Sequence, residues 1–109
     1  MKYMMFVCTD TEPEADQSRV PDIQTWVKDV HHTGKALMGD RLAPAETATT
    51  VRVRGGELLI TDGPFAETKE VIAGFDILEC ADLDEAIAVA AAHPMAYSGR
   101  IELRPYADL

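Results

Sequence analysis

Basic residues are scarce in this chain, and so are cysteines, aromatic residues and long apolar runs. The 109 residues include 10 lysines and arginines against 19 aspartates and glutamates, which gives a net charge of −9. This charge repels a phosphate backbone, so we expect no nucleic-acid partner. No apolar run approaches the roughly 20 residues of a membrane-spanning helix, so we expect no membrane association.

The few cysteines and histidines argue against a metal site. Cys8 and Cys80 lie in apolar runs typical of strands, and no CxxC motif is present. Two buried thiols are ordinary in a reduced protein, which indicates a cytoplasmic location. His31 and His32 are adjacent and point to different sides of a helix, so they cannot chelate one metal ion together. With no phosphate-binding glycine loop either, we expect neither metal nor cofactor.

What is present is a globular composition of single-domain size. Apolar residues make up 47% of the chain and charged residues 27%. This apolar content is too high for a disordered chain, and the length fits one domain over residues 1–109. A domain this small buries a modest core, so pairing with a second copy would stabilise it.

Apolar periodicity predicts six strands and two helices. Ile23, Trp26, Val27 and Val30 form the stripe of a half-buried helix, with Ser18 as N-cap and Gly34 after its end. Asp82 and Glu85 form a capping box at the start of a second helix. The helices are expected at about 19–33 and 83–92, and the strands at 2–9, 35–42, 48–54, 57–61, 70–80 and 100–106.

This order predicts an α+β, ferredoxin-like split βαβ fold. Gly55-Gly56 would close a β-hairpin inserted in the middle, and both helices would cover one face of an antiparallel sheet. The strand at 70–80 is largely apolar on both sides, which indicates that the second face is covered too. We therefore expect a homodimer formed by sheet-to-sheet packing.

One segment carries a family resemblance. Asp62-Gly63-Pro64-Phe65, within the run 61–70 and followed by Gly74-Phe75, resembles the signature of the DGPF branch of the YCII-related proteins. Further matches surround this segment. They are Gly39-Asp40-Arg41-Leu42-Ala43-Pro44, Ala48-Thr49-Thr50-Val51-Arg52, Asp82-Leu83-Asp84-Glu85-Ala86, Ala92-His93-Pro94 and Ile101-Glu102-Leu103-Arg104-Pro105.

The resemblance has implications for both fold and chemistry. It implies a ferredoxin-like fold of the dimeric α/β-barrel group, in which two sheets pack face to face. It also implies that some relatives act on small aromatic or lactone-like substrates by proton transfer, with a His–Asp pair as the chemical core. Most members of the branch have no assigned activity.

His93 and a carboxylate partner are the candidates for catalysis. His93 follows the second helix at a position that matches the family, and histidine can transfer protons near neutral pH. Its carboxylate partner could be Asp62, Asp76 or Asp40. The alternative role of His93 is to satisfy backbone carbonyls at the helix end.

Both main carboxylate candidates have structural alternatives. Asp62 begins a Gly-Pro turn, where an aspartate often hydrogen-bonds the turn's own backbone. Asp76 lies in an apolar strand, where burial would perturb its pKa unless it meets solvent or a cation.

Three further residues are candidates for substrate binding. Arg41 and Lys69 could hold an anionic group, and Phe65 could form an apolar wall of the site. The alternative for the two cations is exposed salt bridging. The sequence thus predicts a small acid/base enzyme that acts on a small organic substrate through a His–carboxylate pair. The competing hypothesis is a non-catalytic dimeric module that binds a small molecule or a regulatory partner.

Overall fold

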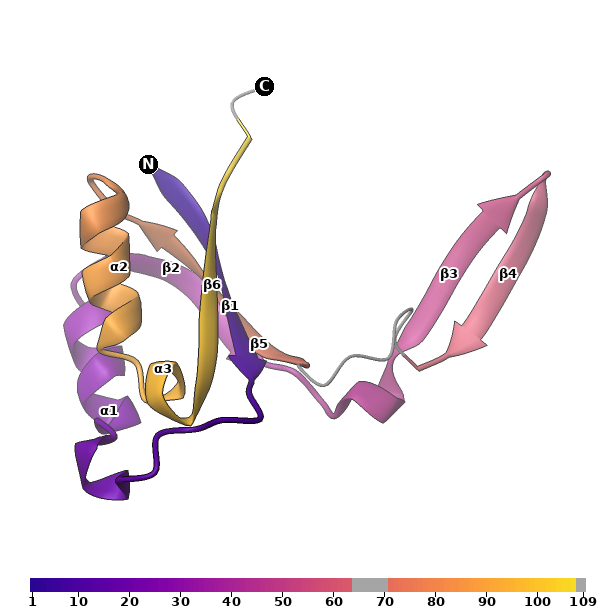
Figure 1. The fold of residues 1–109 in the computed structure, drawn as a ribbon. Helices are drawn as coiled ribbons and strands as arrows, with labels where there is room; N and C mark the ends of the chain where they lie inside the picture. The colour runs from indigo at the N-terminus through magenta and orange to yellow at the C-terminus, as the bar shows by residue number, and fades with distance from the viewer. Residues whose placement is uncertain (64–70, 108–109) are drawn as a thin grey trace.

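The computed structural model describes residues 1–63 and 71–107 and centres on a four-stranded sheet (Figure 1). Its strand order is β2-β5-β1-β6, and every neighbouring pair is antiparallel. The strands are β1 at Lys2–Thr9, β2 at Ala36–Arg41, β5 at Ile72–Glu79 and β6 at Gly99–Pro105. This order confirms the predicted ferredoxin-like arrangement, in which β1 and β5 are the central strands.

Two helical segments cover one face of this sheet (Figure 1). The first is α1 at Ile23–Trp26, which continues without a break into the π-helix η2 at Val27–His31. The second is α2 at Leu83–Ala91, followed by the short α3 at Met95–Ser98. No helix in the described part of the chain is long and apolar enough to cross a membrane.

Aspartate caps set the start of both helical segments. Asp82 accepts a hydrogen bond from the backbone N–H of Glu85 at 2.9 Å, as the capping-box pattern predicts. The first helix begins later than predicted. Asp22 is its cap and accepts from the N–H of Thr25 at 3.1 Å, while Ser18 lies in the 3₁₀ helix η1 at Gln17–Arg19. Asp16 caps this separate turn, so the helix starts only after Pro21.

Replacing Asp82 with alanine is expected to lower the free energy of unfolding by about 1 kcal/mol, because the N–H of Glu85 loses its acceptor. Asp84 is the matched control, since it is an acidic residue of the same turn that caps nothing. Urea titration of the two alanine variants checks this. An equal loss in both variants would show that only the charge near the helix terminus matters.

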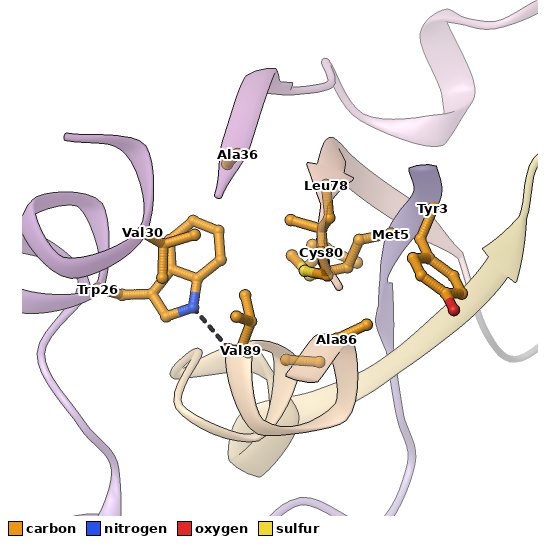
Figure 2. Packing of buried hydrophobic residues seen from close by; sticks show 11 residues of the cluster. Tyr3, Met5, Trp26, Val30, Ala36, Leu78, Cys80, Ala86 and Val89 are labelled. Carbon is orange, nitrogen blue, oxygen red and sulfur yellow. Dashed lines mark hydrogen bonds between the residues drawn. The ribbon is translucent and has the colours of Figure 1, made fainter. Parts of the chain in front are cut away.

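The core lies between the sheet and the two helical segments (Figure 2). Tyr3, Met5 and Leu78 are its largest fully buried side chains. Trp26 joins the two helical segments, because its indole Nε1 donates a hydrogen bond to the carbonyl of Val89 at 2.8 Å (Figure 2). This bond holds α1 against α2 and fixes the orientation of the indole ring.

No described helix covers the opposite face of the sheet (Figure 1). The register places Met4 opposite Ile77 and Phe6 opposite Phe75, and all four side chains on this face are half-buried. This face is therefore apolar at its centre, as the two-sided apolar pattern of the strand at 70–80 predicted.

The hairpin forms a second, separate sheet. Its strands are β3 at Thr49–Arg54 and β4 at Glu57–Asp62, which pair only with each other. Gly55 and Gly56 have positive φ angles of 57° and 77°, as a two-residue turn with right-handed strand twist requires. The hairpin extends away from the main sheet (Figure 1). The radius of gyration is accordingly 16.0 Å, against about 13 Å for a compact chain of this size.

Candidate acid/base site

A cavity of about 480 Å³ opens between the first helical segment, the strands β2 and β5, and the start of α3. Trp26 and Met95 contribute apolar walls, and Ile23 and Val27 extend them. Its volume lies within the range of small-molecule sites. The polar residues that line it are His31, Asp40, Arg41, Asp76 and His93.

Asp76 is held inside the protein by the pleat of β5. Its side chain is on the helix-covered face, and the residue is 7% exposed. Directly opposite on β2 lies Gly39, and a Cβ atom there would collide with Oδ1 of Asp76 and with the carbonyl oxygen of Phe75. Glycine at position 39 therefore makes room for the carboxylate.

His31 is the partner of Asp76. Its Nε2 lies 2.7 Å from Oδ1 of Asp76, a short hydrogen bond between a partly exposed imidazole and a buried carboxyl group. Burial raises the pKa of Asp76 above its ordinary value, while the hydrogen bond and charge of His31 act in the opposite direction.

The π-helix brings His31 to the cavity. In an α-helix, residues five apart lie about 140° apart around the axis. In η2, the N–H of His32 instead bonds the carbonyl of Val27 at 3.2 Å, an i to i+5 bond that places such residues nearly above one another. His31 consequently lies over Trp26, with ring centroids 5.5 Å apart. Single π turns of this kind are frequent at functional sites.

His93 is the second histidine of the cavity and is chemically different. It lies between α2 and α3, is 7% exposed, and contacts Trp26 edge-to-face at 4.7 Å between ring centroids. Its Nδ1 accepts a hydrogen bond from the N–H of Met95 at 2.9 Å. Burial lowers the pKa of His93 to about 4, so the ring is neutral at pH 7 and carries its proton on Nε2.

The Nε2 atom of His93 borders open space. It forms no hydrogen bond among the described residues. Every fully buried side-chain nitrogen or oxygen in that part of the chain does have a partner, so Nε2 of His93 is not fully buried. Because His93 lines the cavity, its N–H is available to a molecule bound there. Within the same residues, His93 makes no hydrogen bond to a carboxylate.

The other predicted site residues divide into three groups. Arg41 lines the cavity at the end of β2, and Asp40 lies beside it. Asp62 ends β4 opposite Thr49 and does not line the cavity. Phe65 and Lys69 lie outside the described residues. The structure therefore brings His93, Asp76 and Arg41 to one cavity and leaves Asp62 at the base of the hairpin.

Sequence reasoning missed His31. It placed both neighbouring histidines in the first predicted helix and rejected them as a metal-chelating pair, without considering His31 as an acid/base group. A signal was available, because His31 follows Val27 by four residues and so continues the apolar stripe of that helix. Over residues 1–63 and 71–107, no three His, Cys, Asp or Glu side chains are arranged to hold a metal ion.

Fold and cavity together define an α+β protein of ferredoxin-like topology with a His–Asp pair beside an apolar pocket. The family model of the YCII-related domain matches residues 1–109. The chain is also 39% identical, over 98 residues, to an uncharacterized protein of Rhizobium meliloti (strain 1021), with 86% of this chain and 77% of that protein covered. The chain thus belongs to the YCII-related family.

Proposed function

We propose that this protein is a small acid/base enzyme that moves a proton on a small organic substrate through His31 and Asp76. The observation that supports this proposal most directly is the 2.7 Å contact between His31 and the buried Asp76 at the edge of a cavity of about 480 Å³. A histidine oriented by a carboxylate is the usual arrangement of a general base near neutral pH.

In the proposed mechanism, His31 transfers the proton and Asp76 positions it. Asp76 accepts the Nε2–H of His31, which leaves Nδ1 as the basic nitrogen. Nδ1 has no hydrogen-bond partner among the described residues, so it can take a proton from a bound molecule and return it to another atom. The negative charge of the carboxylate stabilises the imidazolium that forms in between.

We propose a role for His93 that differs from the one expected from the sequence. With its pKa lowered to about 4, it is a poor proton acceptor at pH 7. Its neutral Nε2–H can instead donate a hydrogen bond to an oxygen that gains negative charge. This pairing of a base and a neutral donor suits a carbonyl compound with an acidic C–H bond, since removal of that proton places charge on the carbonyl oxygen.

The rest of the cavity supports a small, partly apolar substrate. Trp26 and Met95 can contact an apolar or aromatic body. Arg41 at the end of β2 can attract an anionic group, as the sequence suggested. Phe65 and Lys69 remain proposed contacts from the segment that follows Asp62.

We propose in addition that the chain is one domain of the DGPF branch and works as a cytoplasmic homodimer. The half-buried apolar face formed by Met4, Phe6, Phe75 and Ile77 supports sheet-to-sheet packing, because no described helix covers it. Two such sheets facing each other would form the barrel-like dimer that the family resemblance implies.

The experiment that tests the chemistry does not require knowledge of the natural substrate. A panel of small carbonyl compounds with acidic C–H bonds is incubated with the protein in D₂O, and loss of the C–H signal is followed by proton NMR. We expect accelerated exchange for at least one aromatic or lactone-like member. His31→Gln should slow that exchange roughly 100-fold or more, because the base is lost.

His32→Gln is the matched control, since His32 is the adjacent, exposed histidine of the same segment. It should leave the exchange rate unchanged. If compounds bind but exchange no faster than in buffer, or if both variants exchange like the wild type, the acid/base proposal fails. Binding without exchange would favour the non-catalytic binding module.

A further inference from the structure

We propose that the hairpin of β3 and β4 is a docking arm whose apolar face packs against a second copy of this chain. This inference concerns an interaction surface, and it is independent of the chemistry proposed for His31 and Asp76. It goes beyond sheet-to-sheet pairing because it assigns a separate element, distant from the open sheet face, to the contact between copies.

The cross-strand register divides the hairpin into two unlike faces. On one face Val51 lies opposite Ile60 and Val53 lies opposite Leu58, so four apolar side chains are contiguous. On the other face the pairs are mostly polar or charged: Thr50 with Thr61, Arg52 with Leu59, and Arg54 with Glu57.

The apolar face of the hairpin is open to solvent in the single chain. Val51, Val53, Leu58 and Ile60 are between 57% and 62% exposed. The two strands join no other strand, and the hairpin lies apart from the main sheet (Figure 1). A two-stranded hairpin is only marginally stable in water unless its apolar face is packed against something. The other described residues of the chain therefore do not cover the apolar face of the hairpin.

The size of the exposed apolar face favours a second copy of the chain as the surface that covers it. The four side chains expose on the order of 400 Å² of apolar surface, a size that marks interaction sites. In a two-fold dimer, both hairpins would be covered at once, each by an equal area of the partner, which buries on the order of 1,600 Å² in total. This is the typical size of a stable, specific interface.

The charge distribution of the chain also favours a second copy as the partner of the hairpin. The whole chain carries a net charge of −9, so most of its surface repels another copy. Residues 49–62 carry two basic side chains, Arg52 and Arg54, and two acidic ones, Glu57 and Asp62, and are neutral as a unit. The hairpin is thus a surface through which two such acidic chains can meet without electrostatic repulsion.

The test compares Ile60→Glu with Thr61→Glu by sedimentation over a dilution series of the full chain. Both variants add one carboxylate to β4, but the first places it on the apolar face and the second on the opposite face. We expect Ile60→Glu to raise the dimer dissociation constant at least about tenfold, because it buries an unpaired charge. Thr61→Glu should leave the constant unchanged.

Hydrogen exchange of the peptide spanning 49–62 supplies an independent measurement. Its amides should be protected in the dimeric wild type and in Thr61→Glu, and should exchange rapidly in Ile60→Glu, while β1 and β5 stay protected in all three. Equal dissociation constants for wild type and Ile60→Glu would overturn the docking arm but leave a sheet-to-sheet dimer standing. A wild type that stays monomeric throughout the dilution series would overturn both. Neither outcome affects the D₂O exchange test of His31.

Discussion

Replacing Gly39 with alanine is expected to destabilise the protein by on the order of 3 kcal/mol and to abolish the proton-transfer function proposed above. The added Cβ would occupy the position of the Asp76 carboxylate and would also collide with the backbone oxygen of Phe75. A side chain can rotate away from such a collision, but a strand backbone cannot. The substitution should therefore disrupt both the register of β2 against β5 and the contact between His31 and Asp76.

Gly74→Ala is the matched control for this prediction. Gly74 lies on the same pair of strands and also lines the cavity, but a Cβ there would approach the carbonyl oxygen of Asp40 only to 3.0 Å. A shift of a few tenths of an ångström relieves this contact. Thermal and urea unfolding of both variants, with the D₂O exchange assay, would measure the difference. Equal stability of Gly39→Ala and wild type would contradict the close approach of Gly39 and Asp76.

The second large effect concerns acid stability. The pKa of His93 is lowered to about 4 in the folded protein, whereas a histidine in the unfolded chain titrates near 6.5. Between about pH 4 and pH 6.5, His93 binds a proton in the unfolded state but not in the folded state. The free energy of unfolding therefore falls as the pH falls. The contribution of His93 is fully present above about pH 6.5 and is lost by about pH 4, and it amounts to on the order of 3 kcal/mol.

His93→Asn isolates this contribution. The asparagine Oδ1 can accept the N–H of Met95 in place of Nδ1, but the side chain does not titrate. The variant should lose markedly less stability than the wild type between pH 6.5 and pH 4, as measured by urea unfolding at a series of pH values. Asp76 contributes with the opposite sign, because its raised pKa favours the folded state at low pH. This contribution is common to both proteins, so parallel pH profiles would show that His93 is not the cause.

The fold was predictable from the sequence because its elements follow local rules. Period-two patterns and the Gly55-Gly56 turn identified the strands and the hairpin, and the Asp82 capping box identified α2. The start of the first helix was misplaced, because Ser18 and Asp22 are both good caps and the sequence alone does not rank them. The separation of the hairpin from the main sheet depends on tertiary contacts, which no local pattern encodes.

The site was only partly predictable. Asp76 was a visible anomaly in an apolar strand, and His93 was a visible candidate beside Pro94. The pairing of Asp76 with His31 was not visible, because it depends on one π turn that carries His31 around the helix to the carboxylate. A period of 3.6 residues cannot anticipate such a turn. The role of His93 likewise follows from burial, a property of the packed chain.

Trp26 gives the protein a built-in optical reporter. It is the chain's sole tryptophan, it forms part of the cavity wall, and its ring meets the rings of both His31 and His93 edge-to-face. Indole emission responds to the polarity around the ring and is quenched by a neighbouring imidazolium. Fluorescence of the unlabelled protein thereby reports at one position on whether the cavity is occupied and on whether either histidine is protonated.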